Sequence, residues 1–230
     1  MKINILRFIE GAKQAKGLTV IIDVLRAFSL ECYLFGMGAA GIRPVGSVEE
    51  AWLFKREHPD WLLMGERRGK KCEGFDYGNS PSSVNEEIIQ GKHIIHTTSA
   101  GTQGIVNAVH AGQIITGSLV NAKAIAEYIR QANPDEVSLV CMGNNGVTIA
   151  KEDELCARYI KSLLENQPLE DLEEQIGGLQ FDGGEHFFNP LTQEIFPEPD
   201  FWLCMKHDIF DFVIEIQRDE LGFVSLKREV

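Results

Sequence analysis

Residues 93–119, HIIHTTSAGTQGIVNAVHAGQIITGSL, decide the fold class of this 230-residue chain. The apolar, β-branched run 93–97 predicts a short buried strand, and 113–117 predicts another. Between them, 102–112 has the apolar spacing of a helix that closes on glycine. Two strands joined through a helix normally run parallel in one sheet, so this segment predicts an α/β fold.

The same alternation continues on both sides of that segment. The helix predicted over 47–57 begins with a capping box, Ser47 followed three residues later by Glu50. Together the elements predict a mainly parallel or mixed sheet with helices on both faces. The remaining predicted strands are 18–23, 41–45, 61–65 and 136–143, and the remaining predicted helices are 25–39, 83–91, 121–132 and 151–166.

The alternation stops after residue 166. Residues 167–200 are acidic, broken by Gly and Pro, and receive no assignment. Residues 210–216 and 223–228 predict two strands that pair across QRDELG. We therefore expect residues 1–230 to form a single compact α/β unit, in one body or two lobes, with a C-terminal β element at about 200–230.

Composition excludes several classes of protein. A net charge of −12 argues against nucleic-acid or anionic-membrane binding. The five cysteines include no CxxC pair, which favours a reducing cytoplasm over a disulfide framework or a Cys-rich zinc site. No apolar run approaches the roughly 20 residues of a membrane span. The sequence is compatible with a homo-oligomer such as a dimer.

Polar side chains follow the predicted strands where they end. Asp23 and Arg26 follow the strand 18–23, and Glu66 and Arg67 follow 61–65. Parallel strands finish at one edge of a sheet, where α/β proteins bind ligands, so we expect one cleft there. Turn formation and helix capping are the alternative explanation for the small polar residues. The hydroxyl and amide candidates for substrate binding at later strand ends are Thr97, Thr98, Ser118 and Asn121.

Residues 65–81, GERRGKKCEGFDYGNSP, add Asp76, Asn79 and Ser80 to these candidates. Carboxylate oxygens suit Mg²⁺, which keeps several waters and commonly bridges to phosphate. Arginine can hold a phosphate through two parallel hydrogen bonds, a role we assign to Arg26 and Arg67. For Arg68, Lys70 and Lys71 we favour a solvated surface over a role in attracting substrate. The predicted metal ligands are Asp23, Glu66, Asp76 and Asp153.

Well-known catalytic motifs are absent: there is no GxxxxGK[ST] loop, GxSxG elbow or HExxH pair. Asp23 resembles the nucleophile of aspartyl-phosphate phosphatases, but Leu25 stands where those enzymes carry a second Asp. Within the residues themselves, Asp23 can equally be a metal ligand, a general base or a nucleophile.

Five stretches, in order, resemble the 2-phosphosulfolactate phosphatase (ComB) family. They are VIIDVLRAFS, GERRGKKCEGFDYGNSPSSV, HTTSAGTQGI, GSLVNAKAIA and KEDELCARYI with the glycine turn before it, and they span residues ~19–160. The chain departs from the family at Ala100, where Asn is usual, and at Arg68, where Gly is common.

The resemblance implies a ComB-like fold and a Mg²⁺-dependent hydrolase acting on a small anionic phosphorylated substrate. The reaction would convert 2-phosphosulfolactate to 3-sulfolactate and phosphate, in coenzyme M biosynthesis. A phosphatase for another 2-phospho-hydroxyacid and a non-catalytic phospho-ligand binding protein are the alternatives. The implied site residues are Asp23, Arg26, Glu66, Arg67, Asp76, Asn79, Ser80, Thr98, Ser118, Asn121 and Asp153.

Overall fold

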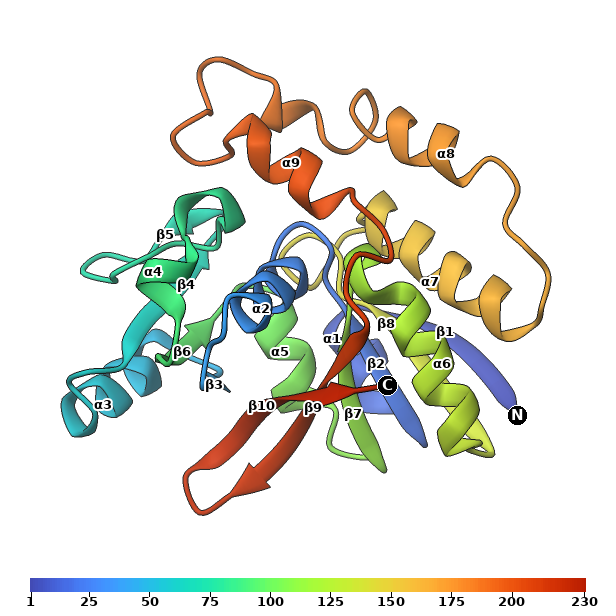
Figure 1. Cartoon of the computed structure of the whole chain (residues 1–230), viewed down its shortest axis with the longest axis horizontal. Coiled ribbons are helices and arrows are strands. Elements are labelled where there is room, and N and C mark those ends of the chain that lie inside the picture. Colours follow the sequence, from blue (N-terminus) through green and yellow to red (C-terminus); the bar gives the residue numbers. More distant parts are fainter.

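The computed structural model describes residues 1–230. Its strands form one ten-stranded sheet in the order β1-β8-β2-β7-β9-β10-β3-β6-β4-β5 (Figure 1). The strands are β1 (Lys2–Arg7), β2 (Leu18–Ile22), β3 (Gly41–Pro44), β4 (Leu62–Arg67), β5 (Lys70–Lys71), β6 (His93–Thr97), β7 (Gln113–Gly117), β8 (Glu136–Cys141), β9 (Phe212–Asp219) and β10 (Gly222–Glu229).

The sheet is mixed, with two parallel blocks on either side of an antiparallel hairpin. β1, β8, β2 and β7 pair in parallel, as do β3, β6 and β4. The C-terminal hairpin β9–β10 lies between the blocks and pairs antiparallel with β7 and β3. Only one residue pair, Ser225 with Ile42, joins β10 to β3. The predicted pairing of the last two strands is thus confirmed, and its central position explains the mixed sheet.

Helices cover both faces of the sheet, as the alternation predicted. Along β2, Val20 and Ile22 pack on one side with residues of α6 and α7, whereas Ile21 packs on the other with α1 and α5. This alternation follows the two-residue period of a strand. The helices are α1 (Phe8–Gln14), α2 (Ala27–Gly36), α3 (Val48–Glu57), α4 (Glu86–Ile89), α5 (Gly101–Asn107), α6 (Ala122–Ala132), α7 (Lys151–Leu164), α8 (Leu172–Gly178) and α9 (Glu198–Cys204).

Local sequence signals place most element ends correctly. Ser47 caps α3 by accepting from the Glu50 N–H at 3.0 Å, as predicted. The helix predicted over 83–91 is shorter, because Asn85 rather than Ser83 is its cap. β1 and α1 were not predicted.

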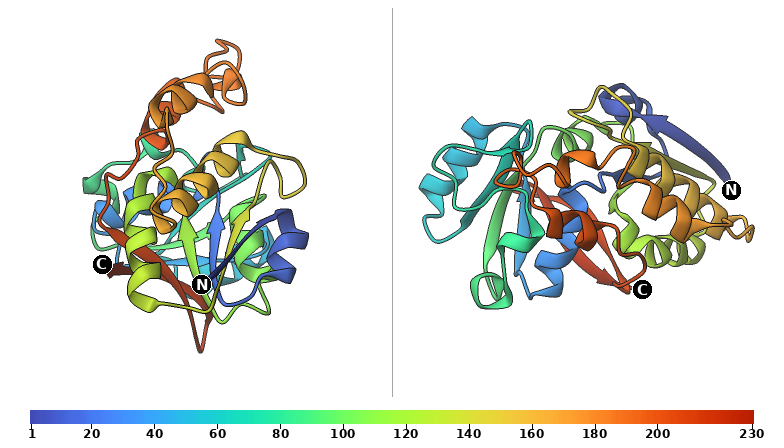
Figure 2. Two further views of the ribbon diagram at one scale, coloured as in Figure 1. Left: turned by 90° about the vertical axis from the view of Figure 1, so that its right-hand side faces the viewer. Right: turned by 90° about the horizontal axis from the view of Figure 1, so that it is seen from above.

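Residues 167–200, which receive no assignment from sequence, form together with 201–205 a cap over the carboxyl ends of β2 and β8. The cap contains α8, a 3₁₀ turn at Glu185–Phe187 and α9, and it rises above the sheet in Figures 1 and 2. No helix combines the length and apolar composition that crossing a bilayer requires.

His207 joins helix α8 of the cap to the segment that follows α9. The His207 Nε2 lies 2.6 Å from Glu173 Oε1 in α8, and Nδ1 lies 3.0 Å from Asp208 Oδ2. Burial lowers the pKa of His207, but the hydrogen bonds to the Asp208 and Glu173 carboxylates raise it more, so the net shift is upward. The charged imidazole therefore stabilises the folded state.

His207→Gln should reduce the free energy of unfolding more at pH 5.5 than at pH 9. A raised folded-state pKa contributes stability that is complete below the unfolded value and disappears as the pH rises through the folded value. Because the group is partly exposed, the difference should stay within about 1 kcal/mol. Urea unfolding at the two pH values measures it, and an equal loss at both would contradict the assignment.

Candidate active site

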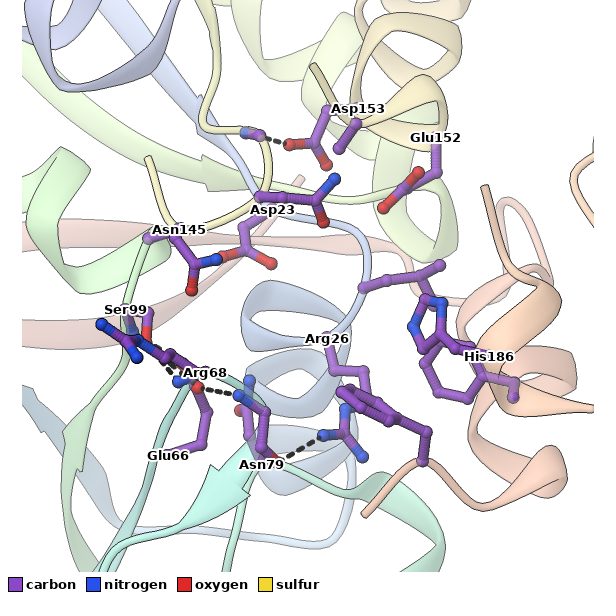
Figure 3. Close-up of a pocket in the computed structure, with 18 residues that line it drawn as sticks. Asp23, Arg26, Glu66, Arg68, Asn79, Ser99, Asn145, Glu152, Asp153 and His186 are labelled. Carbon is purple, nitrogen blue, oxygen red and sulfur yellow. Dashed lines mark hydrogen bonds between the residues drawn. The ribbon is translucent and has the colours of Figure 1, made fainter. Parts of the chain in front are cut away.

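A cavity of about 340 Å³ lies where the cap meets the strand ends. Its walls come from the turns after β2, β4, β6 and β8, from the start of α7 and from the cap (Figure 3). Its polar and charged lining residues include Asp23, Arg26, Glu66, Arg68, Asn79, Ser99, Asn145, Glu152, Asp153 and His186.

Asp23 leaves β2 and enters the cavity as a buried carboxyl group. Its Oδ1 accepts from the Ala27 N–H at 3.1 Å, at the start of α2. A Cβ on Gly101 would lie only 2.9 Å from Asp23 Oδ2, so the glycine leaves room for the carboxyl group. Burial raises the pKa of Asp23 to about 6, and the Glu66 carboxylate adds to the rise.

The first turn of α7 supplies two more carboxyl groups with different roles. Asp153 is engaged by backbone, since its two oxygens accept from Val24 N–H and Gly143 N–H, each at 2.8 Å. It thereby holds together the turns that follow β2 and β8. Glu152 makes no side-chain hydrogen bond, and burial together with the Asp23 charge raises its pKa to about 7. Glu152 was not predicted, because sequence alone does not distinguish it from Asp153.

Strand alternation at the end of β4 directs the Glu66 and Arg67 side chains to opposite sides. Glu66 accepts from the Gly69 and Ser99 N–H groups at 2.6 Å and lines the cavity. The Arg67 side chain lies elsewhere and donates to the Glu66 carbonyl and to Thr97 Oγ1, at 2.7 and 2.9 Å. Arg67 therefore does not occupy the substrate-clamping position predicted for it.

Arg68 occupies the position that we had assigned to Arg67. Its backbone is left-handed, with φ of 54°, which explains why glycine suits this place in the family pattern. The exposed side chain lines the cavity, and its guanidinium has no hydrogen bond or ion pair within the chain. The exposed position agrees with the solvated surface favoured from sequence, and the guanidinium is at the same time free to bind an anion in the cavity.

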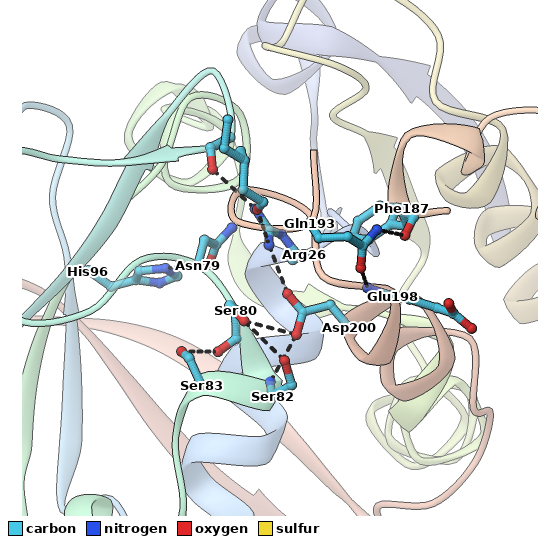
Figure 4. Close-up of polar contacts among 12 residues, drawn as sticks. Arg26, Asn79, Ser80, Ser82, Ser83, His96, Phe187, Gln193, Glu198 and Asp200 are labelled. Atoms are coloured by element: carbon cyan, nitrogen blue, oxygen red, sulfur yellow. Dashed lines mark hydrogen bonds and ion pairs between the residues drawn. The ribbon is translucent and has the colours of Figure 1, made fainter. Parts of the chain in front are cut away.

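Arg26 is held by the cap. Its Nη1 donates to Asp200 Oδ2 at 2.8 Å and to the Ile195 carbonyl at 3.0 Å. The rings of Phe187 and Phe196 flank the guanidinium, at 5.7 and 5.1 Å from its central carbon to the ring centroids. Figure 4 shows the pairing of Arg26 with Asp200. These contacts fasten the cap to α2, so the predicted phosphate-clamping role of Arg26 is replaced by a structural one.

The 65–81 loop divides its candidates between two cavities. Asn79 lines the first cavity, while Ser80 and Asp76 line a neighbouring one of about 740 Å³. Ser80 Oγ donates to Asp200 Oδ1 at 2.9 Å. Asp76 Oδ2 accepts from the Leu63 N–H at 2.8 Å. Asp76 thus lies outside the group of carboxylates predicted to share a metal ion.

The other hydroxyl and amide candidates are buried beneath the cavity. Thr98 exchanges hydrogen bonds with Thr102, and its Oγ1 accepts from the Thr102 N–H at 3.0 Å. Ser118 pairs with Ser29, and its N–H donates to Asn121 Oδ1 at 3.2 Å. The expectation that Thr98 and Ser118 line the cleft is therefore wrong: they cap helices, as turn chemistry alone would require. Thr97 is bound to Arg67.

The cap adds a cavity residue that the sequence did not identify. His186 lines the cavity from the 3₁₀ turn, and burial and the nearby Arg26 charge lower its pKa. No local sequence motif predicts that His186 reaches the cavity or that the cap lies over the strand ends.

The donor set fits a magnesium ion that keeps most of its waters. No three His, Cys, Asp or Glu side chains are placed to hold one metal ion together. Mg²⁺, however, is commonly bound by one or two carboxylates with waters and phosphate oxygens completing the octahedron. Asp23 supplies a buried carboxylate that forms no ion pair within the chain, a group that suits such an ion.

Comparison with known proteins identifies the family of the chain. The sequence model of the 2-phosphosulpholactate phosphatase family matches residues 5–180. A protein of Caldicellulosiruptor saccharolyticus is 39% identical over 86% of this chain and 88% of its own length. One of Carboxydothermus hydrogenoformans is 41% identical over 76% of this chain and 72% of its own. A third, of Bacillus subtilis, is 29% identical over 88% of both. Each is named a probable 2-phosphosulfolactate phosphatase.

Proposed function

Because this chain belongs to the 2-phosphosulpholactate phosphatase family, we propose that it uses Mg²⁺ to hydrolyse 2-phosphosulfolactate to 3-sulfolactate and phosphate. The chain is an enzyme, a phosphoric monoester hydrolase. The product would serve coenzyme M biosynthesis.

The observation that carries the proposal is the separation of charge within one cavity. Buried carboxyl groups of Asp23 and Glu152 line one side, and the free guanidinium of Arg68 lines another (Figure 3). A phosphate paired with a cation suits the acidic side, and a second anionic group suits Arg68. A substrate that carries a phosphate and a sulfonate satisfies both.

The residues divide the work as follows. Asp23, fixed by the Ala27 N–H, would hold Mg²⁺ together with water molecules. When bound, the ion neutralises charge on the phosphoryl group. The Glu152 carboxyl group accepts no hydrogen bond from another residue and has a pKa of about 7, so it can accept a proton near neutral pH.

Hydrolysis would then proceed in one step, by direct attack of water on phosphorus. The oxygen of a water molecule forms a bond to phosphorus while its proton passes to Glu152. The bond between phosphorus and the C2 oxygen breaks, and that oxygen leaves with the electron pair and takes a proton from solvent. Arg68 holds the sulfonate and fixes the orientation of the ester.

A substrate panel tests the proposal. Phosphate release is measured with Mg²⁺ on 2-phosphosulfolactate, 2-phospholactate and phosphoglycerate. We expect the highest kcat/KM for 2-phosphosulfolactate. A higher value for a carboxylate ester would assign a different 2-phospho-hydroxyacid, and phosphate release from none of them would contradict the function.

Arg68→Ala should raise KM for 2-phosphosulfolactate about 10- to 100-fold, the equivalent of a lost charge-assisted hydrogen bond. The KM of a phosphate monoester without a second anion should change little. Lys71→Ala, which removes an exposed cation outside this cavity, is the matched control. Equal effects of the two variants on 2-phosphosulfolactate would show that Arg68 acts only through the overall charge.

A further inference from the structure

A buried chain of three polar side chains leads from α2 to the cavity. His96, in β6, is 0% exposed. Its Nδ1 lies 2.9 Å from Glu31 Oε1, and its Nε2 lies 3.1 Å from Asn79 Oδ1. Glu31 is also 0% exposed, whereas Asn79 is 5% exposed and lines the cavity (Figures 3 and 4).

Packing alone does not account for Glu31. A carboxyl group in the core is costly unless hydrogen bonds satisfy it, and Glu31 Oε2 has no partner at all. The only hydrogen bond of the Glu31 side chain is to His96. Its position is explained if it fixes the rotation of the imidazole ring.

The direction of the chain follows from its donors and acceptors. An amide oxygen accepts and cannot donate, so His96 Nε2 must carry the hydrogen in its bond to Asn79 Oδ1. That bond leaves the Asn79 NH₂ group without a partner in the chain. Two N–H donors at the wall of this cavity suit an anionic oxygen.

We propose that Glu31 and His96 are positioning residues that hold Asn79 with its NH₂ group directed at a phosphoryl oxygen of the substrate. Asn79 is the group that touches substrate, and His96 acts only through it. This inference rests on the proposed function, since it names donors for the same reaction. Preorganised donors of this kind stabilise the charge that develops on phosphoryl oxygens in the transition state.

A double-mutant cycle tests the proposal. Asn79→Ala should lower kcat about a hundredfold, the typical effect of removing one preorganised donor. His96→Asn keeps an N–H group for Glu31 but cannot reach Asn79, and it should lower kcat at least tenfold. The double variant should be no slower than Asn79→Ala, because His96 acts through Asn79. His93→Asn, in the same strand but exposed, is the control and should match the wild type.

Two further measurements are added. The first shows whether a loss of kcat comes from misfolding, and the second does not require the true substrate to be known. His96→Gln, whose amide nitrogen can donate to Asn79, should recover part of the kcat lost in His96→Asn at the same thermal midpoint. Binding of inorganic phosphate with Mg²⁺ should weaken in Asn79→Ala and His96→Asn. Multiplicative losses in the double variant, or kcat within twofold of wild type in His96→Asn, overturn the proposal.

The outcomes also separate this proposal from the proposed function. Weakened phosphate binding in both variants, in a protein that hydrolyses no ester of the panel, supports the positioning chain and refutes the phosphatase function. Full turnover with unchanged kinetics in both variants refutes the positioning chain and leaves the function. A wild type that neither hydrolyses nor binds phosphate refutes both.

Discussion

Asp23→Asn should lower phosphatase activity by about 10²- to 10⁴-fold while making the metal-free protein more stable. Asparagine keeps an oxygen to accept from the Ala27 N–H, so the local turn is preserved. The change removes a buried charge that forms no ion pair within the chain. Activity and stability should therefore move in opposite directions.

The pH dependence of that stabilisation follows from the raised pKa. Burial raises the pKa of Asp23 from 3.8 to about 6. The folded state binds this proton more tightly than the unfolded state, so the ionised group costs stability in full above pH 6, and the cost decreases as the pH falls from about 6 toward the unfolded value of 3.8. Asp23→Asn should thus gain roughly 1 to 3 kcal/mol at pH 8 and less at pH 4.5.

The effect of Mg²⁺ on thermal stability distinguishes the proposed metal ligand, Asp23, from the proposed base, Glu152. Mg²⁺ should raise the thermal midpoint of the wild type, because a ligand that binds only the folded state stabilises it. The rise should be lost in Asp23→Asn and kept in Glu152→Gln, although both variants lose activity. Asp60→Asn, at an exposed carboxylate, is the control. An equal Mg²⁺ effect in wild type and Asp23→Asn would remove Asp23 from the metal site.

Arg26→Met should destabilise the protein by about 3 to 5 kcal/mol, the usual cost of leaving a buried charge unpaired. Both Arg26 and Asp200 are almost fully buried, at 4% and 0% exposure. Asp200 Oδ1 also accepts from Ser80 Oγ and the Ser82 N–H, so the ion pair links the cap to two turns beside the cavity. Activity should fall as well, because the cap supplies His186 and one wall of the cavity.

The double variant Arg26→Met with Asp200→Asn is the matched test. Asparagine removes the unpaired charge and keeps an acceptor for the Ser82 N–H, so part of the lost stability should return. Activity should not return, because the contact between α2 and the cap is still missing. Urea unfolding measures the first effect and phosphate release the second. An Arg26→Met protein as stable as wild type would show that the pair does not hold the cap.

Sequence periodicity predicted most of the fold because its signals are local. Strands such as 93–97 and helices such as 47–57 carry their period and caps within a few residues. The position of the hairpin β9–β10 could not be predicted, since it depends on pairing with β7 and β3, far away in the sequence. The sequence allowed a mainly parallel or a mixed sheet, and this hairpin makes the sheet mixed.

The candidate site was predicted in part, for a similar reason. Asp23 and Glu66 follow strands directly, and the structure brings both to one cavity. The exchange of Arg67 for Arg68 could not be foreseen, since Arg68 lies just past the end of β4 and its left-handed backbone turns the chain toward the cavity. Arg26 was assigned to substrate because its partner, Asp200, lies 174 residues away in a segment without a recognisable pattern.

The most direct test of the central claim is phosphate release from 2-phosphosulfolactate by protein treated with EDTA and then given Mg²⁺. The account predicts no release after EDTA, recovery with Mg²⁺ in the wild type, and no recovery in Asp23→Asn at any Mg²⁺ concentration. Full activity in metal-free protein, or wild-type recovery in Asp23→Asn, would contradict a magnesium-dependent phosphatase site at this cavity.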